Sequence, residues 1–131
     1  MAGRVMRITA GQVVAEGRLS ESRTATVIWN ALPIDARAQT WGDEIYFDIG
    51  IGADAESPQE VVAMGDLAYW PPGQAFCIFF GRTPASRGDE IRAASGVTVV
   101  GRVTGDATVF KRVRSGTAIR LERASEGGAK R

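Results

Sequence analysis

Residues 66–84 read Asp-Leu-Ala-Tyr-Trp-Pro-Pro-Gly-Gln-Ala-Phe-Cys-Ile-Phe-Phe-Gly-Arg-Thr-Pro, and this stretch does most to decide the fold. It contains five of the ten Trp, Tyr and Phe residues of the chain. Pro71 and Pro72 fix φ and lack an N–H, and Gly73 is expected to supply the positive φ that closes a tight turn. Residues 75–80 are apolar at every position. They predict a strand covered on both faces, with the core on one side and a helix, a loop or a ligand on the other.

Length and charge are typical of a single soluble domain. The chain has 131 residues, 44% of them hydrophobic and 24% charged, and a formal net charge of +1. The arginines are spread along the chain, so neither nucleic acid nor an anionic membrane is expected as a partner. No apolar run approaches the ~18 residues of a membrane span, and we expect a cytoplasmic protein. The expected organisation is one domain over residues 1–123 and a disordered tail over 124–131.

The residue types that are missing exclude several kinds of chemistry. The chain has no histidine, which excludes a histidine-dependent triad, a histidine-ligated zinc site and an imidazole general base. It has one cysteine, which excludes an intramolecular disulfide. Cys77 lies inside an apolar run and is interpreted as a small buried residue. We therefore expect neither a metal nor a cofactor.

Alternating and β-branched segments predict a mainly β fold. Strands are expected over residues 4–10, 13–19, 39–49, 97–103 and 117–122, besides those around the aromatic stretch. Ser22 is expected to cap a helix over residues 23–32, and a second short helix is expected over 106–113. Residues 84–94 are polar and are expected to form a surface loop. Because no strand–helix–strand alternation is present, we predict a closed eight-stranded antiparallel β-barrel with two short helices.

Three blocks of sequence carry a resemblance to a known family. They are Thr-Trp-Gly-Asp-Glu-Ile-Tyr-Phe at 40–47, the segment from Pro-Gln-Glu-Val-Val through Gly-Asp to Tyr-Trp-Pro-Pro-Gly at 58–73, and Phe-Phe-Gly-Arg-Thr-Pro at 79–84. Over residues 4–123 the chain resembles the atypical cyclophilin-like family of small prokaryotic proteins, whose function is undefined. The resemblance implies an eight-stranded closed barrel capped by two helices, as in peptidyl-prolyl isomerases.

The motifs of the classical isomerases are absent. Classical cyclophilins carry a Phe-His-Arg strand and a Gln-Gly-Gly-Asp turn around their groove. The corresponding strand here, residues 44–47, contains neither histidine nor arginine, and residues 64–66 match only the end of the turn. No catalytic residue is therefore assigned, and we expect the groove to bind better than it catalyses.

A group of aromatic and charged residues forms the predicted ligand-binding site: Trp41, Glu44, Tyr46, Tyr69, Phe79 and Arg82. Two interpretations of Glu44 are open. As a carboxyl among aromatic rings it has a raised pKa and acts as an acid or base, or it only accepts a hydrogen bond or pairs with an arginine. Arg82 either holds a carboxylate or phosphate or stacks at the surface on Trp70 or Tyr69. Trp41 and Trp70 are either core residues or walls of the groove.

Three functions are compatible with these residues. The first is a cyclophilin-like module whose aromatic groove binds a small molecule or a peptide. The second is an enzyme, either a weak prolyl isomerase or one acting on a small carboxylate or amide metabolite. The third is a subunit whose groove contacts a partner protein.

Overall fold

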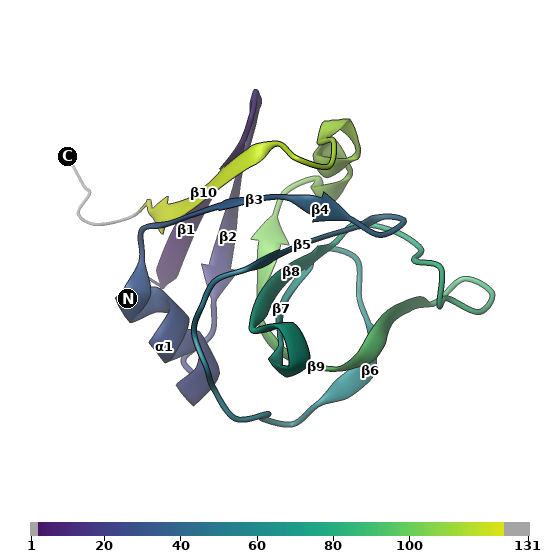
Figure 1. Ribbon diagram of the computed structural model, residues 1–131, viewed down its shortest axis with the longest axis horizontal. Helices are drawn as coiled ribbons and strands as arrows, with labels where there is room; N and C mark the ends of the chain where they lie inside the picture. The colour runs from purple at the N-terminus through teal and green to yellow at the C-terminus, as the bar shows by residue number, and fades with distance from the viewer. Residues whose placement is uncertain (1–2, 125–131) are drawn as a thin grey trace.

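The computed structural model of the chain describes residues 3–124 as one strand-rich unit (Figure 1). The predicted tail lies, from residue 125 onward, outside the described residues. In chain order the elements are β1 (Arg4–Ala10), β2 (Val13–Leu19), α1 (Arg23–Ala31), β3 (Ile34–Arg37), β4 (Gln39–Thr40), β5 (Glu44–Asp48), β6 (Gln59–Val62), β7 (Asp66–Trp70), the 3-10 helix η1 (Pro71–Gly73), β8 (Ala75–Phe79), β9 (Ile91–Thr104), the 3-10 helix η2 (Ala107–Arg112) and β10 (Ala118–Arg123).

The strands form one ten-stranded antiparallel sheet, and the prediction of a closed eight-stranded barrel is wrong. The order across the sheet is β3-β10-β1-β2-β9-β7-β8-β5-β4, with β6 pairing separately to β9. The two outer strands, β3 and β4, do not pair with each other. The sheet curls around a core but stays open along this edge.

The open edge has a simple covalent cause. β3 and β4 are separated only by Ala38 and run on as one extended segment (Figure 1). The first part of this segment pairs with β10 and the second with β5. Ala38 itself bonds to the β10 side, donating to the Thr117 carbonyl and accepting from the Gly116 amide. Two consecutive parts of one extended segment cannot form backbone hydrogen bonds with each other, so β3 and β4 cannot pair to close the sheet. The chain between them spans the gap.

Strand β8 is buried on both faces, as its continuous apolar sequence predicted. Phe76 and Ile78 belong to the main core inside the curled sheet, whereas Cys77 and Phe79 belong to a second apolar cluster on the outer face. All five residues of β8 are buried. The strand therefore joins two cores, and something must cover its outer side.

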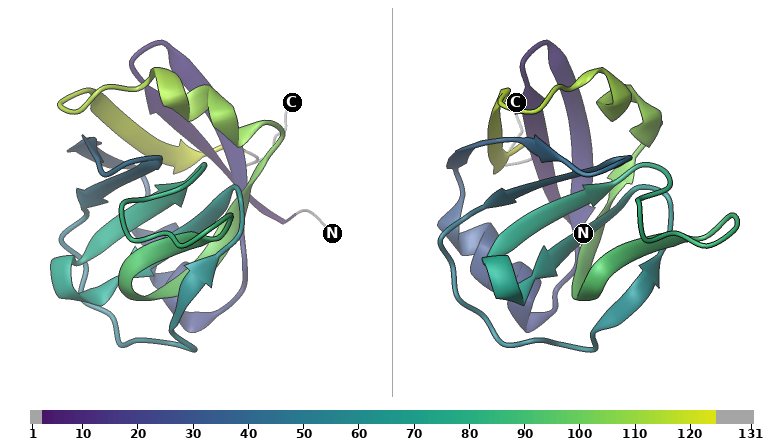
Figure 2. Two further views of the ribbon diagram at one scale, coloured as in Figure 1. Left: turned by 90° about the vertical axis from the view of Figure 1, so that its right-hand side faces the viewer. Right: turned by 45° about the vertical axis from the view of Figure 1, so that its right-hand side comes forward.

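The cover is provided by the first half of β9 together with β6. Residues 91–97 of β9 leave the sheet and pair antiparallel with β6, and we call this hairpin-like pair the arm. Its apolar residues Val62, Ile91, Ala93 and Val97 pack into the outer cluster. Residues 98–104 then return to the sheet between β7 and β2. The loop of residues 81–90, which leads into the arm, projects from the body of the molecule beside it (Figures 1 and 2).

Most local predictions are confirmed, and two are corrected. β1, β2 and α1 lie where expected, and the Ser22 hydroxyl accepts from the Ala25 amide at the start of α1. The single strand predicted over 39–49 is instead a hairpin, because residues 41–43 form a turn between β4 and β5. The loop predicted over 84–94 ends earlier, since β9 begins at Ile91.

Because β8 is buried on both faces, substitutions on either face should lower the stability of the fold. Replacing Phe79 by leucine should lower the free energy of unfolding by about 1–2 kcal/mol, because a buried ring on the outer face loses packing. The same change at Phe76, in the main core, should have an effect of similar size. Val14→Ala, at a side chain 57% exposed, is the control and should change stability by less than about 0.5 kcal/mol. Urea denaturation measures all three, and a Phe79→Leu effect as small as the control would show that the arm does not cover β8.

Candidate functional site

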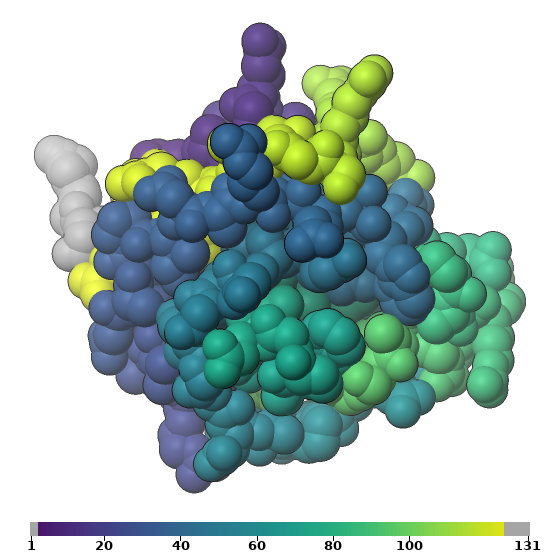
Figure 3. Space-filling model, in the orientation of Figure 1, coloured from purple at the N-terminus to yellow at the C-terminus, as the bar shows by residue number. Residues whose placement is uncertain are grey.

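A pocket opens on the outer face of the sheet where β5, the end of β7 and the arm meet. It has a volume of about 250 Å³ and is lined by Trp41, Glu44, Tyr46, Trp70 and Ala94. Glu44 and Tyr46 are two residues apart and lie on the same face of β5, and Ala94 comes from the arm. In the space-filling view, the teal atoms around residues 70–75 and the green atoms of the first part of β9 lie next to each other on this face (Figure 3). Three of the five lining residues are aromatic and one is a carboxylic acid.

A tight turn places Trp41 at the edge of this pocket. The Trp41 amide donates to the Glu44 carbonyl at 2.9 Å, and Gly42 adopts φ +62° between them. A Cβ at Gly42 would lie 3.0 Å from the Arg82 carbonyl oxygen, so the turn also requires a residue without a side chain. The Asp43 amide donates to that same carbonyl at 2.9 Å. The Trp-Gly-Asp and Phe-Gly-Arg-Thr blocks of the sequence are thus in direct contact.

The Trp-Pro-Pro-Gly corner brings a second tryptophan, Trp70, to the pocket. A Cβ at Gly73 would lie 2.9 Å from the Trp70 ring, so glycine at this position leaves room for the indole. The predicted positive φ falls instead on Gln74, at +46°, which corrects the expected role of Gly73. The Trp70 indole N–H donates to the Ser95 hydroxyl at 2.7 Å and so ties the ring to the arm. Both tryptophans are half-buried, as pocket walls are.

Glu44 is a buried carboxylic acid that has no cationic partner within residues 3–124. Its residue is only 6% exposed, and none of the ion pairs among residues 3–124 includes it. Burial raises the pKa of Glu44 from 4.5 to about 7, although a hydrogen bond with the Cys77 side chain opposes the rise. Burial, together with the nearby Glu44 charge, raises the pKa of the Cys77 thiol well above its ordinary value. Cys77 is therefore a neutral thiol beneath the pocket, and Glu44 titrates near neutral pH.

Two of the predicted site residues lie in the protein interior. Tyr69 is 1% exposed and belongs to the main core, and its hydroxyl donates to the Ile51 carbonyl and accepts from the Ala53 amide. Phe79 is fully buried in the outer cluster, against which Tyr46 and Trp70 pack. Neither Tyr69 nor Phe79 lines the pocket, but Phe79 belongs to the cluster that supports two residues that do.

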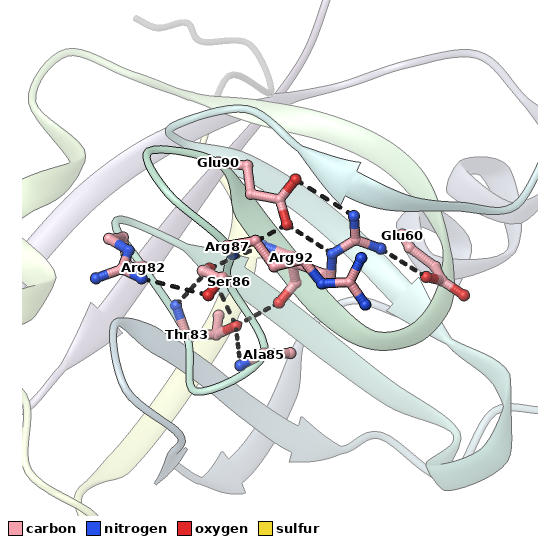
Figure 4. Close-up of polar contacts among 8 residues, drawn as sticks. All are labelled: Glu60, Arg82, Thr83, Ala85, Ser86, Arg87, Glu90 and Arg92. Atoms are coloured by element: carbon pink, nitrogen blue, oxygen red, sulfur yellow. Dashed lines mark hydrogen bonds and ion pairs between the residues drawn. The ribbon is translucent and has the colours of Figure 1, made fainter.

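Arg82 is exposed, does not line the pocket and contacts its own loop of residues 81–90 (Figure 4). Its guanidinium donates to the Ser86 carbonyl at 3.3 Å. The same loop is closed by the Ser86 hydroxyl, which accepts from the amides of Thr83 and Arg92 at 3.0 and 3.1 Å. The structure therefore brings Trp41, Glu44 and Tyr46 together and leaves Arg82 outside the pocket they line.

A second arginine fastens the loop to the arm. The Arg92 guanidinium donates to Glu90 at 2.6 Å through Nε and to Glu60 at 2.8 Å (Figure 4). Hydrogen bonds from Arg92 hold the pKa of the Glu90 carboxyl below its ordinary value. Glu60 is on β6 and Arg92 on β9, so this pair links the two strands of the arm across the molecule's surface.

Trp70 and Ala94 are pocket residues that the predicted set did not contain. Trp70 was recognisable from its Trp-Pro-Pro-Gly context, which left it open as a wall or a core residue. The sequence did not indicate Ala94 as a pocket residue, because its segment was predicted to be a polar surface loop. Its position in the structure depends on the pairing of β9 with β6.

The described residues show no sign of a metal centre or a membrane-spanning helix. No group of three or more Cys, Asp or Glu residues within 3–124 is arranged to hold a metal ion. Among the helices of that range, none has the length and apolarity needed to cross a bilayer.

Comparison with known proteins assigns the chain to a family. A family model described as Cyclophilin-like matches residues 4–122, and the chain belongs to this family, which confirms the resemblance seen in its sequence. The fold is similar to the solution structure of the hypothetical protein AF2241 from Archaeoglobus fulgidus, with 39% identity and a TM-score of 0.79. That similarity covers 93% of this chain and 95% of the archaeal chain. Among curated proteins none matches this sequence.

The raised pKa of Glu44 predicts how stability changes with pH. The folded protein holds a proton on Glu44 up to about pH 7, whereas the unfolded chain loses it near the ordinary value of 4.5, so Glu44 lowers stability as pH rises through this window. Glu44→Gln mimics the protonated acid. Its stability relative to wild type should therefore increase by about 2–3 kcal/mol between about pH 4.5 and 8.

Urea denaturation at several pH values measures this difference. The exposed residue Glu21 provides the matched control, because Glu21→Gln makes the same chemical change outside the pocket. A constant difference between wild type and Glu44→Gln would contradict the raised pKa.

Proposed function

We propose that the pocket between Trp41 and Trp70 binds a small organic molecule or a single peptide side chain. The observation that carries this proposal is a concave site walled by three aromatic rings, with one buried carboxyl group that forms no ion pair within residues 3–124. Pockets of this kind, apolar with a few placed polar groups, are the usual form of ligand sites. At about 250 Å³ the pocket is slightly smaller than that class, whose members have about 300–1,000 Å³, and this favours a compact ligand.

The pocket is formed by parts of the chain that are held rigidly. Gly42 fixes the turn that carries Trp41, and the Ser95 hydroxyl holds the Trp70 indole. Glu44 and Tyr46 lie on a strand between two partners, β4 and β8. Preorganised walls of this kind lose little conformational entropy when a ligand binds.

Tryptophan fluorescence tests the proposal directly. Trp29, on α1, is remote in the fold from the pocket and stacks under Arg123 at 4.8 Å, so a Trp29→Phe variant leaves only Trp41 and Trp70 to report. A collection of small metabolites and short peptides is screened by thermal shift, and each compound that stabilises the variant is then titrated. We expect ligands that change the emission and that lose at least about tenfold in affinity in Trp70→Ala, because a desolvated aromatic contact is removed.

The matched control replaces an aromatic residue outside the pocket, Phe110→Leu, and should leave ligand affinity unchanged. Phe110 is fully buried in the main core. Ligands whose affinity falls equally in both variants would show that the effect comes from lost stability and not from the pocket.

Acid–base chemistry at Glu44 is the second candidate function. A carboxyl whose pKa is about 7 holds and releases a proton at neutral pH, which suits a general acid or base. Its position in the wall of an apolar pocket favours a substrate with an amide over one with a carboxylate, since a second negative charge would be repelled. Turnover that disappears in Glu44→Gln, while binding remains, would support an enzyme.

Prolyl isomerisation should be slow in this protein. Rotation about the X–Pro bond crosses a barrier of ~18–20 kcal/mol, and a ~10⁵-fold acceleration needs ~7 kcal/mol of selective stabilisation of the twisted amide. In classical cyclophilins a guanidinium supplies the donor to the prolyl nitrogen, but no arginine of residues 3–124 lines this pocket. We expect a rate on a proline tetrapeptide orders of magnitude below that of a classical cyclophilin assayed alongside. A rate within about tenfold of that enzyme would contradict this reading and direct attention to Arg82, Arg92 and Arg102 as donors.

A further inference from the structure

The chemistry of the pocket walls points to the charge of the ligand. The rings of Trp41, Tyr46 and Trp70 line it together with the Glu44 carboxyl. Aromatic rings attract cations through their quadrupole, most strongly for tryptophan and most strongly where water is excluded. A carboxylate in the same wall adds a direct negative charge. Both features favour a positively charged ligand over a neutral or an anionic ligand.

No cationic side chain of residues 3–124 fills this role. The basic side chains on the neighbouring segments are engaged elsewhere: Arg82 with the Ser86 carbonyl, Arg92 with Glu60 and Glu90, and Lys111 with Asp43 at 3.2 Å. None of them lines the pocket. Within the described chain the Glu44 carboxyl has the Cys77 side chain as its partner and no counter-ion. An incoming cation would therefore supply a missing charge without displacing an existing ion pair.

We propose that the ligand is an organic cation of the alkylammonium class, a protonated or quaternary amine whose charge lies between the tryptophan rings and against the Glu44 carboxyl. This inference rests on the proposed function, since it assigns a ligand class to the same pocket. The small volume matches a compact head group of this kind. An amine presented on a peptide, as in a lysine side chain, has the same chemistry.

Binding of such a cation should be linked to proton release. In the empty pocket Glu44 has a pKa of about 7, because burial disfavours its charged form. A bound cation favours the ionised carboxylate and so lowers that pKa. Affinity should then be constant above about pH 8 and fall by about tenfold per pH unit below 7.

The other ionisable groups around Glu44 do not replace it in this linkage. On β5 and its turn, on β7 and β8 and in the arm, these groups are Asp43, Tyr46, Asp48, Glu60, Asp66, Tyr69, Cys77 and Arg92. Asp66 pairs with Arg102 at 3.2 Å, and Asp43 and Arg92 are in the ion pairs described above. The Cys77 thiol has its pKa raised well above the ordinary value and stays neutral.

A pair of isosteric probes tests the proposal. (2-Hydroxyethyl)trimethylammonium and 3,3-dimethyl-1-butanol have the same shape but differ in charge, and butyrate provides an anion of similar size. Binding to the Trp29→Phe variant is followed by fluorescence and by the indole N–H signals of Trp41 and Trp70 in NMR spectra. At about pH 8 we expect the cation to bind at least about tenfold more tightly than the neutral isostere, and the anion more weakly than either. At about pH 5.5 the affinity for the cation should be about 30-fold lower, and that for the neutral isostere unchanged.

Glu44→Gln separates the carboxylate from the shape of the pocket. In this variant the preference for the cation should shrink and its pH dependence should vanish, while the neutral isostere binds as before. Glu21→Gln is the matched control and should behave as wild type. Should Glu44→Gln fail to fold, the pH series on the parent protein tests the same linkage.

The outcomes distinguish this proposal from the one on which it rests. Equal affinity for the cation and its neutral isostere, cation binding that does not depend on pH, or preferred binding of the anion would each overturn the organic-cation proposal. The pocket would remain a ligand site in those cases. Metabolite and peptide ligands whose NMR changes map away from Trp41 and Trp70 would overturn the proposed function itself.

Discussion

Burial of β8 on both faces is the constraint on which the rest of this structure depends. A strand whose residues are all apolar cannot leave one face in water, so a second layer has to cover it. Here the second layer is the arm, formed by β6 and the first half of β9. The pocket lies beside this second layer, because Ala94 of the arm lines it together with residues of β5, its turn and the end of β7. The pocket thus depends on the arm that covers the two-sided strand.

Polar contacts hold the arm in place, since its apolar face is small. Arg92 joins both strands of the arm to the loop through Glu60 and Glu90, and Ser95 accepts a hydrogen bond from the Trp70 indole. Charge-assisted bonds to a guanidinium have fixed geometry and limit how far the two layers slide. The shape of the pocket therefore depends on residues that do not line it.

Features that depend on neighbours in sequence were predictable, and those that depend on distant pairing were not. The β1–β2 hairpin and the Ser22 cap follow from local patterns and are present. Closure of the sheet depends on where one extended segment changes partner, at Ala38, and no local pattern marks that residue. In the site, Trp41, Glu44 and Tyr46 were predicted from one short stretch of sequence, although the turn at residues 41–43 was not. Tyr69 lies in the interior because alternation along β7 turns it away from Trp70, and Arg82 is drawn into its own loop.

A second buried carboxyl shows what a purely structural role looks like in this fold. Asp66 is 4% exposed, and its oxygens accept from the Ala63 amide at 2.9 Å and from Arg102 at 3.2 Å. Glu44 is buried to the same degree but has a neutral thiol as its partner and opens onto a pocket. An unpaired buried acid lowers stability at neutral pH, and an amide of the same shape would avoid the loss. The contrast between the two residues is therefore easier to explain if the Glu44 charge is completed by a ligand, as the charge of Asp66 is completed by the protein.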